Sequence, residues 1–413
     1  MESKRKILII GGGAAGLIAA IAAARNGGEV TILERMNRVG KKILATGNGR
    51  CNLTNTNTNI KRFHGNNPKF AFGALGQFDV QQTMDFFEFL GVKCKVEDEG
   101  KVYPYSDQAS SVLDVMRYEL EKLEVKEYCE VEVIKIKKVK DAFQVILSDG
   151  KTLKGDKVIL ATGGKASPKL GSNGSGYQLA EDLGHKINPV FPALIQLKLK
   201  ANYLKQIKGV KFIGQAAISV GGNTLRVEGG EILWTDYGIS GPPILQLSRS
   251  ASEMLEKQKK PLVHVDMFPQ LTSEELEEIL QLRLAYQPER SLDFSFVGLI
   301  NKKLIPVVLK EAGIQQISKP AREVGSKEIK KIVAQLKDWR AEITDTQAWD
   351  HAQVTAGGVD VGDIDPKTME SKLVSGLYIV GELLDIDGDC GGFNLQWAWS
   401  SGFIAGDHAS VGM

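Results

Sequence analysis

The sequence predicts an α/β protein: a Rossmann-like domain interrupted by an inserted β-rich, barrel-like domain and a small helical domain. Three observations predict this class. A strand, a glycine-rich turn and a helix are predicted within the first 25 residues. Short strands with glycine turns begin near residue 191, and buried strand patterns return near residue 350. With 413 residues the chain exceeds what one hydrophobic core usually serves, so several domains are expected.

The N-terminal segment carries a dinucleotide-binding fingerprint in its required context. An apolar strand pattern over residues 6–10 leads into the run GGGAAG at residues 11–16, which matches G-x-G-x-x-G, and an Ala-rich helical pattern follows to residue 25. In this motif Gly11 permits the tight turn and Gly13 lets the backbone approach a pyrophosphate. Gly16 lets the helix pack closely on the strand. The pyrophosphate is then expected at the N-terminus of the helix.

The second strand, residues 30–33, ends in Glu34. Its position relative to Gly11 is close to the spacing of about 20 residues at which an acid contacts the ribose hydroxyls. A carboxylate there disfavours a 2′-phosphate, so FAD or NAD is preferred over NADP, although Arg35 follows directly.

Bulk composition excludes some classes of protein. A net charge of +2 does not indicate a dedicated nucleic-acid binder, so nucleic acid is not expected as a partner. Four dispersed cysteines without a CxxC pair or zinc spacing favour a reduced, cytoplasmic protein without a metal site. The uncharged residues 7–24 are long enough for a membrane span, but the GGG run favours a strand, a turn and a buried helix.

The pattern along the chain predicts a discontinuous domain organisation. Residues 1–190 and 350–413 are expected to form the nucleotide-binding domain, residues 191–270 and about 337–349 the barrel-like insertion, and residues 271–336 the helical one. The helical part opens on the capping box TSEE at residues 272–275.

Three further segments favour FAD as the dinucleotide: residues 34–42, the strand and turn KVILATGG at 157–164, and GLYIVGELLDIDGDCGGFNLQ at 376–396. Together with KKILATGNGRCNLTN, WTDYGISGPPILQLS and VTAGGV, they resemble the HI0933-like (YhiN-like) family within the two-dinucleotide-binding flavoproteins. The family often has Gly where Asn48 stands and Thr where Cys390 stands. Asn keeps the tolerance for left-handed backbone.

The resemblance implies FAD contacts in the segments that carry the motifs. The residues are Gly11, Gly13, Ala15, Gly16, Glu34, Arg35, Lys42, Thr46, Asn48, Gly49, Arg50, Cys51, Asn52, Val131, Thr162, Gly163, Gly381, Glu382, Asp385, Gly391, Gly392, Asn394, Leu395 and Gln396. Backbone N–H groups of these turns would bind the pyrophosphate and flavin O2, and the Asn side chains would match the polar edge of the ring.

The resemblance also implies an FAD-dependent oxidoreductase that acts on a small molecule. No second fingerprint is found, so NAD(P)H would bind only transiently in the substrate cleft. Direct reduction of the flavin by substrate, with oxygen or another acceptor reoxidising it, is the other option. A flavoenzyme that modifies tRNA and a flavin-binding protein without turnover stay open as alternatives. The substrate and the oligomeric state are not predicted.

No catalytic residue is predicted. Arg50, in a glycine loop, is expected to meet an anion, either the pyrophosphate or reduced flavin. Cys51 is expected to pack as a small buried thiol, and Tyr103 and Tyr105 either line the pocket or pack under a loop. No histidine lies in a base–nucleophile pattern, and His64, which is nearest the cofactor loop, is expected at the surface.

Overall fold

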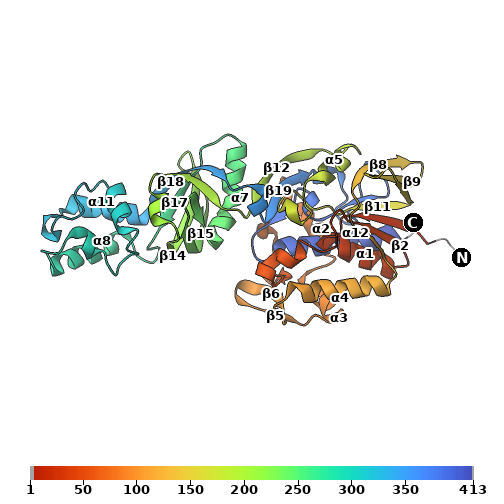
Figure 1. Ribbon diagram of the computed structural model, residues 1–413, viewed down its shortest axis with the longest axis horizontal. Coiled ribbons are helices and arrows are strands. Elements are labelled where there is room, and N and C mark those ends of the chain that lie inside the picture. The colour runs from red at the N-terminus through yellow and green to blue at the C-terminus, as the bar shows by residue number, and fades with distance from the viewer. Residues whose placement is uncertain (1–3, 412–413) are drawn as a thin grey trace. The chain divides into compact units, whose positions relative to one another are not determined.

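The computed structural model describes residues 4–411 and divides into two units. Unit 1 contains the chain up to Pro192 and from Ala352 onward, and unit 2 contains Ala193–His351. Both can be followed in Figure 1, where unit 1 combines the red and blue ends of the chain.

The centre of unit 1 is a parallel five-stranded sheet with the order β20-β11-β1-β2-β7. Its strands are β1 (Lys6–Ile10), β2 (Glu29–Leu33), β7 (Lys126–Tyr128), β11 (Lys157–Leu160) and β20 (Leu377–Ile379). The central strands are apolar and buried, as in parallel sheets covered on both faces. The predicted Rossmann-like class is confirmed.

Two helices from opposite ends of the chain pack side by side on this sheet: α1 (Ala14–Arg25) and α12 (Phe393–Ser410) (Figure 1). Glycines on α12 permit the close approach. A Cβ at Gly402 would lie 2.3 Å from the carbonyl oxygen of Ala15, and one at Gly406 would lie 2.2 Å from that of Ala19. Residues 7–24 therefore form the expected strand, turn and buried helix. Among residues 4–411, none of the helices has the length and apolar character that a membrane crossing needs.

Smaller elements surround this core. The helices are α2 (Phe72–Leu75), α3 (Val80–Phe89), α4 (Ala109–Lys122) and α5 (Ser175–Glu181). The outer strands are β3 (Thr54–Asn55), β4 (Phe63–His64), β5 (Cys94–Val96), β6 (Lys101–Pro104), β8 (Val133–Val139), β9 (Ala142–Leu147), β10 (Thr152–Gly155), β12 (Ile187–Ala193), β19 (Val354–Val359) and β21 (Asp387–Gly388).

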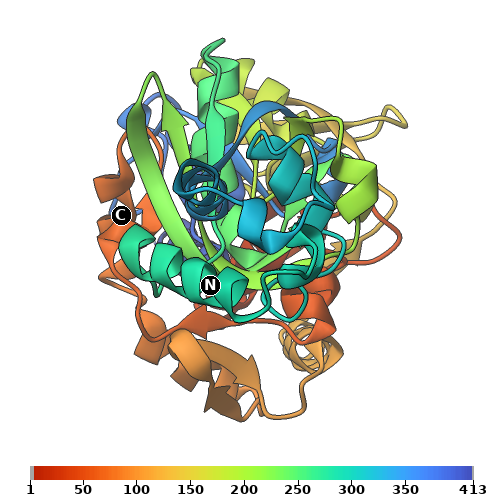
Figure 2. The ribbon, with the colours of Figure 1, turned by 90° about the vertical axis from the view of Figure 1, so that its left-hand side faces the viewer.

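Unit 2 contains a closed barrel of six strands in the order β13-β16-β15-β14-β17-β18. They are β13 (Leu197–Lys200), β14 (Lys211–Val220), β15 (Asn223–Trp234), β16 (Gly238–Ser240), β17 (Leu262–Asp266) and β18 (Trp339–Thr346). Figure 2 shows the long β14–β15 hairpin. Tyr203, Trp234 and Trp339 pack their rings together in the core. The predicted barrel-like insertion is confirmed.

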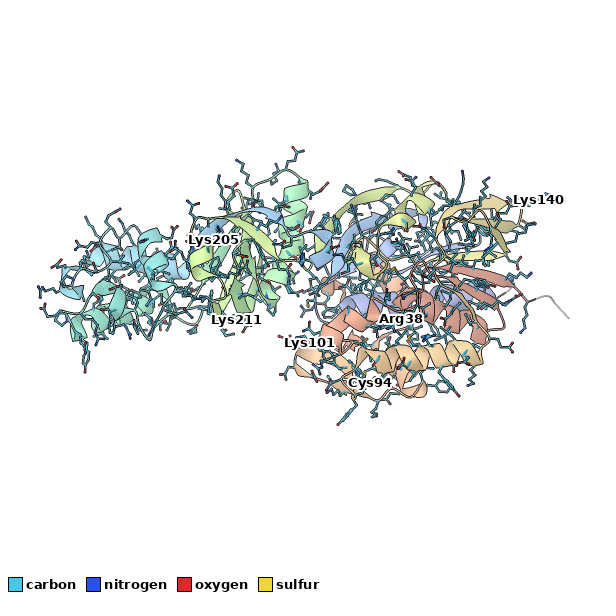
Figure 3. All side chains as sticks on the ribbon, viewed as in Figure 1. Arg38, Cys94, Lys101, Lys140, Lys205 and Lys211 are labelled. Carbon is cyan, nitrogen blue, oxygen red and sulfur yellow. The ribbon has the colours of Figure 1, made fainter. Side chains whose placement is uncertain are left out.

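The helices of unit 2 are α6 (Leu204–Ile207), α7 (Pro242–Glu256), α8 (Ser273–Tyr286), α9 (Leu292–Ser295), α10 (Ile305–Glu311) and α11 (Ser326–Lys337). Thr272 and Glu275 form the expected capping box at the start of α8. Surface lysines of both units, among them Lys140, Lys205 and Lys211, lie exposed (Figure 3).

Candidate functional site

The fingerprint turn leaves a space in front of α1. A Cβ at Gly11 would lie 2.5 Å from the carbonyl oxygen of Ala161, and one at Gly16 would lie 1.9 Å from that of Gly11. A Cβ at Gly13, the N-cap of α1, would meet no described atom within 4 Å. Gly11 and Gly16 are therefore required for packing, whereas Gly13 borders an open cradle at the positive end of the helix.

Glu34 is buried beside this cradle. Its carboxylate accepts hydrogen bonds from the backbone N–H of Gly12 and of Met36, both at 2.8 Å. A carboxylate has about four lone-pair positions, so capacity remains for ribose hydroxyls. Val131 donates its backbone N–H to the carbonyl of Glu34, which places it next to the predicted ribose site. A hollow lined in part by Arg35, Lys41 and Glu130 opens at the same place.

The segment Ala45–Asn55 forms a tight wrap rather than an open loop. Gly47, Asn48, Gly49 and Cys51 all have positive φ angles, which fold the backbone back on itself. The hydroxyl of Thr46 donates to the carbonyl of Ile43 at 2.6 Å. Residues 45–50 of this wrap are exposed or partly exposed, and residues 51–55 are buried.

Cys51 lies inside the wrap. It is fully buried, and burial raises the pKa of its thiol to about 12, because a thiolate would lose its hydration there. The thiol is therefore protonated at neutral pH and unreactive, in agreement with the packing role expected for it.

Arg50 has protein partners on both sides. Its Nε donates to Asp107 at 2.8 Å, Nη2 contacts Glu97, and the guanidinium stacks 4.0 Å from the ring centroid of Tyr103. The pKa of Arg50 is raised, first by the hydrogen bond to Glu97 and then by that to Asp107. Its contact with an anion stays a prediction. Tyr103 is buried beneath it and Tyr105 is exposed.

The C-terminal motif meets the wrap at the start of α12. Gly391 and Gly392 have φ angles of 121° and 101°, and a Cβ at Gly392 would lie 2.4 Å from the carbonyl of Thr54. Asn55 donates its amide to the carbonyl of Gly391 at 2.8 Å. The Oδ1 of Asn52 is buried here without a hydrogen-bond partner among the described residues, so it is available to an N–H group of a ligand.

The side chains of Asn394 and Gln396 are committed to the protein. Asn394 accepts from the backbone N–H of Gly388 and donates to its carbonyl, both at 2.8 Å. Gln396 is fully buried and donates to Thr83 and Ser400, each at 2.9 Å. Any ligand contact at these two positions would use the backbone. Leu395 between them is partly buried.

The other predicted residues lie where the strand ends meet the two helices. Gly381 lies next to Ala15, since a Cβ on it would be 3.1 Å from that of Ala15. Lys42 pairs with Glu382 at 2.9 Å, which joins the two ends of the chain. Thr162 and Gly163 follow β11, and a Cβ at Gly176 would lie 1.9 Å from Thr162 Oγ1, which closes α5 onto that turn.

Asp385 lies between Glu382 and the turn at Gly391, and it is 3 % exposed. Its Oδ2 accepts from the backbone N–H of Asn66 at 3.1 Å and from Nδ2 of Asn188 at 2.9 Å. Among the predicted residues of unit 1, those that follow the carboxyl ends of the parallel strands β1, β2, β11 and β20 are Gly11, Glu34, Thr162 and Gly381.

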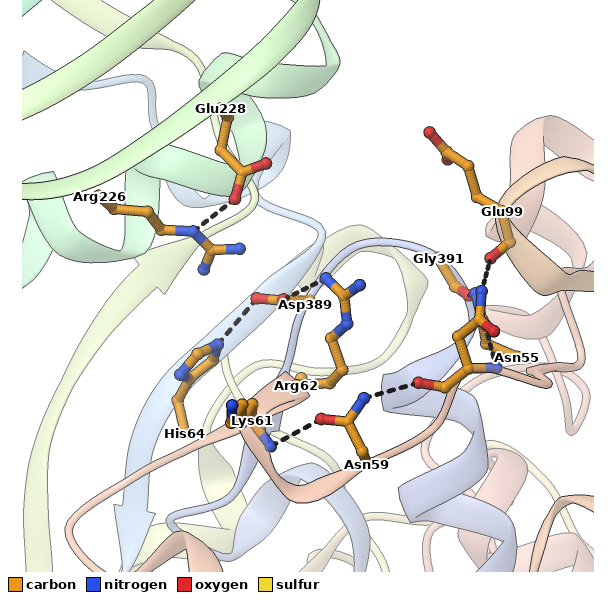
Figure 4. Close-up of polar contacts among 12 residues, drawn as sticks. Asn55, Asn59, Lys61, Arg62, His64, Glu99, Arg226, Glu228, Asp389 and Gly391 are labelled. Atoms are coloured by element: carbon orange, nitrogen blue, oxygen red, sulfur yellow. Dashed lines mark hydrogen bonds and ion pairs between the residues drawn. The ribbon is translucent and has the colours of Figure 1, made fainter.

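Sequence reasoning missed a histidine–aspartate pair at the same turn (Figure 4). The Nε2 of His64 lies 2.8 Å from Oδ1 of Asp389, and Arg62 contacts Oδ2 at 3.3 Å. Asp389 is 4 % exposed and the His64 side chain 23 %. His64 is partly exposed, and the expectation of a surface histidine did not include its partner, the buried Asp389, which lies 325 residues further along the chain. No local spacing signals such a pair.

A second histidine in unit 2 also has an aspartate partner. His264 contacts Asp338 through Nδ1 and Ser219 through Nε2, both at 2.7 Å. This places a serine, a histidine and an aspartate in one hydrogen-bonded chain, which the sequence analysis did not expect. Ser219 is 4 % exposed, so its hydroxyl is closed to an incoming substrate. No group of metal-ligating side chains was found among residues 4–411.

Comparisons with known proteins show the family to which the chain belongs. The family model described as "HI0933-like protein Rossmann domain" matches residues 5–408. A "3-dehydro-bile acid delta(4,6)-reductase" of Clostridium scindens is 44% identical over 98% of this chain and 99% of its own. A "Ribosomal RNA dihydrouridine synthase" of Escherichia coli is 30% identical over 95% of each chain.

A solved structure has the same fold. The 3-ketosteroid delta1-dehydrogenase of Sterolibacterium denitrificans covers 98% of this chain and 100% of its own, with a TM-score of 0.51 and 11% identity.

The fold, the cradle and the reductase relative together define a Rossmann-type oxidoreductase. The chain belongs to the HI0933-like family, so the predicted resemblance and the predicted enzyme class are confirmed.

Proposed function

We propose that the protein binds FAD non-covalently and reduces a carbon–carbon double bond conjugated to a carbonyl group in a small molecule, with NAD(P)H as the source of electrons. The observation that carries the FAD part is the open cradle at Gly13, which the buried carboxylate of Glu34 borders. The reductase at 44% identity supports the substrate class.

The two kinds of relative share one chemistry. A bile acid with a 3-oxo group and conjugated double bonds and a uracil ring both present a C=C bond next to a carbonyl group. Reduction of either adds a hydride to one carbon and a proton to the other. A conjugated C=C is therefore the substrate feature that the names of both relatives have in common.

The chain's own residues would hold the cofactor. The N-terminus of α1 and the backbone at Gly13 would bind the pyrophosphate, and Glu34 would accept from the ribose. The wrap over Ala45–Asn55 and the turn at Gly391 and Gly392 would line the ring end, where Asn52 Oδ1 awaits a donor. Bound FAD would supply two electrons; the protein would supply position and electrostatics.

Ribosomal RNA is the second candidate substrate, because a relative with 30% identity carries that name. We favour a small molecule, since the relative with 44% identity acts on one and the net charge is only +2. Salt-dependent binding of ribosomal RNA and formation of dihydrouridine would favour the second candidate.

The test begins with the purified protein. We expect acid treatment to release FAD, anaerobic NADH or NADPH to bleach its absorbance, and a conjugated enone, such as cyclohexenone or a 3-oxo bile acid with a C=C bond next to its ketone, to restore it. Protein that is colourless and cannot be reconstituted with FAD would refute the cofactor. Bleached protein that no enone reoxidises would refute the substrate class.

Two matched glycine variants test the cradle. Gly13 and Gly325 are both helix N-caps with extended backbone, and neither has a described atom within 4 Å of a Cβ. We expect Gly13→Leu to abolish FAD binding and Gly325→Leu, at the start of α11, to leave it intact. Full FAD content in Gly13→Leu would refute the placement.

A further inference from the structure

The pair formed by His64 and Asp389 adds a group that the reduction requires. This inference rests on the proposed function, because the reduction of a conjugated C=C bond requires the addition of a proton to a carbon atom of the substrate. We propose that His64 is the proton donor of that reaction and that Asp389 is the positioning residue that orients it.

The pair is attached to the turn predicted to bind the flavin ring. Strand β4, which contains His64, pairs with β21, where Asp387 is opposite His64. The backbone N–H of Asp389 donates to the carbonyl of Arg62 at 2.9 Å. Asn394 binds Gly388 on both backbone groups, so the loop leading into Gly391 and Gly392 is fixed. The imidazole therefore has a defined place beside this turn.

The hydrogen bond also fixes the tautomer. A carboxylate only accepts, so Nε2 of His64 carries the proton that points at Asp389. Asp389 is almost wholly buried, so its negative charge needs nearby partners. Arg62 and His64 both contact its carboxylate. Nδ1 has no hydrogen-bond partner among residues 4–411 and belongs to a partly exposed side chain. Nδ1 is thus the nitrogen that can give a proton to a substrate.

Reduced FAD would supply a hydride, with its two electrons, and would itself be oxidised. The hydride adds to the β-carbon of the enone, and the π electrons of the C=C bond move to give an enolate. The α-carbon then takes the proton from Nδ1 of the His64 imidazolium, and the neutral imidazole regains a proton from water. Asp389 stabilises the imidazolium and holds its orientation, as the aspartate of a catalytic triad does.

The experiment separates the two half-reactions of the FAD-loaded protein. His64→Gln keeps an N–H donor for Asp389 but has no proton to release. We expect it to slow reoxidation by cyclohexenone by about a hundredfold or more, the usual weight of a general acid. Bleaching by NADH or NADPH and reoxidation by ferricyanide, which needs no proton at carbon, should not change. FAD affinity, measured by titration of the apoprotein, should also stay as in the wild type.

Two further measurements exclude a merely structural role. Imidazole added to His64→Ala should restore reoxidation by cyclohexenone. A phenol, which mimics the enolate, should bind the oxidised holoprotein about tenfold more weakly in His64→Gln, as expected for loss of a hydrogen bond to a charged group. Flavin absorbance reports this binding without turnover.

The matched control is His264→Gln in unit 2, because His264 is also 23 % exposed and bound to an aspartate. It should leave all of these quantities unchanged. Reoxidation of His64→Gln by cyclohexenone within threefold of the wild type would overturn the proposal, as would an equal loss with ferricyanide. Wild-type protein that no enone reoxidises would instead overturn the proposed function itself, and the proton donor with it.

Discussion

Each unit contains one histidine bound to an aspartate, and the two pairs differ in what happens at the other ring nitrogen. In unit 2, both ring nitrogens of His264 have hydrogen-bond partners: Nδ1 contacts Asp338 and Nε2 contacts Ser219. In unit 1, Nε2 of His64 contacts Asp389, and Nδ1 has no hydrogen-bond partner in the part of the chain that the structure describes. A histidine–aspartate pair therefore serves stability in unit 2, whereas in unit 1 it leaves a ring nitrogen for the proposed proton transfer.

The two aspartates differ as well. Asp389 is 4 % exposed and lies in the turn before α12, whereas Asp338 is 36 % exposed and follows α11. A buried carboxylate depends on its partners far more than a half-exposed one.

The largest effect is expected at the turn that carries Asp389. In Gly392→Ala the added Cβ would lie 2.4 Å from the carbonyl of Thr54, at a φ angle of 101°. The turn must move, so we expect loss of FAD and a destabilisation of about 3 kcal/mol or more. Urea unfolding and flavin content measure this. Normal FAD content would mean that the turn is not part of the cofactor site.

Asparagine at the two aspartates compares them directly. Asp389→Asn should lower the free energy of unfolding by about 2 kcal/mol, because the hydrogen bonds that His64 and Arg62 make to the buried carboxylate lose their charge. Asp338→Asn should cost less than about 1 kcal/mol. Chemical denaturation gives both values, and equal losses would show that burial of Asp389 does not set its pair apart from that of Asp338.

Ser219→Ala opens the second ring nitrogen of His264. The loss of a hydrogen bond of 2.7 Å should cost about 1 kcal/mol. The variant makes the unit 2 pair resemble that of unit 1, yet enone reduction should not change, because no predicted cofactor residue adjoins it. A change in turnover would give unit 2 a part in the chemistry.

The smallest effect is expected in the pH dependence of stability. Burial raises the pKa of Asp338, but the hydrogen bonds from Arg340 and His264 outweigh it and leave that pKa lowered. A carboxyl group whose pKa is lower in the folded state stabilises the fold above its unfolded pKa of about 3.9. This contribution to the free energy of unfolding is lost as the pH falls through the folded-state pKa. Asp338→Asn should therefore flatten the loss of stability below about pH 4 by a few tenths of a kcal/mol. Identical acid unfolding curves would contradict this.

Much of the fold followed from the sequence because its signals are local. The glycines at 11, 13 and 16 and the acid at 34 lie within one strand–turn–helix–strand, so their spacing alone predicts the cradle. The capping box at Thr272 and the glycine turn before α12 are local in the same sense.

The side-chain contacts were harder to predict. Asn394 was expected to match the edge of the flavin, but its amide binds the backbone of Gly388. Gln396 is likewise bound by Thr83 and Ser400. Sequence shows that an amide is present; only the fold shows which donors and acceptors reach it first.

The class of domain and the family could be predicted from the residues alone, because strand, turn and helix signals and short motifs act over a few residues. Which polar groups meet depends on the tertiary structure. His64 and Asp389 become a pair because β4 and β21 align there, and Asp389 is buried beneath them. Hydrogen bonds between groups so far apart in the chain depend on the complete fold.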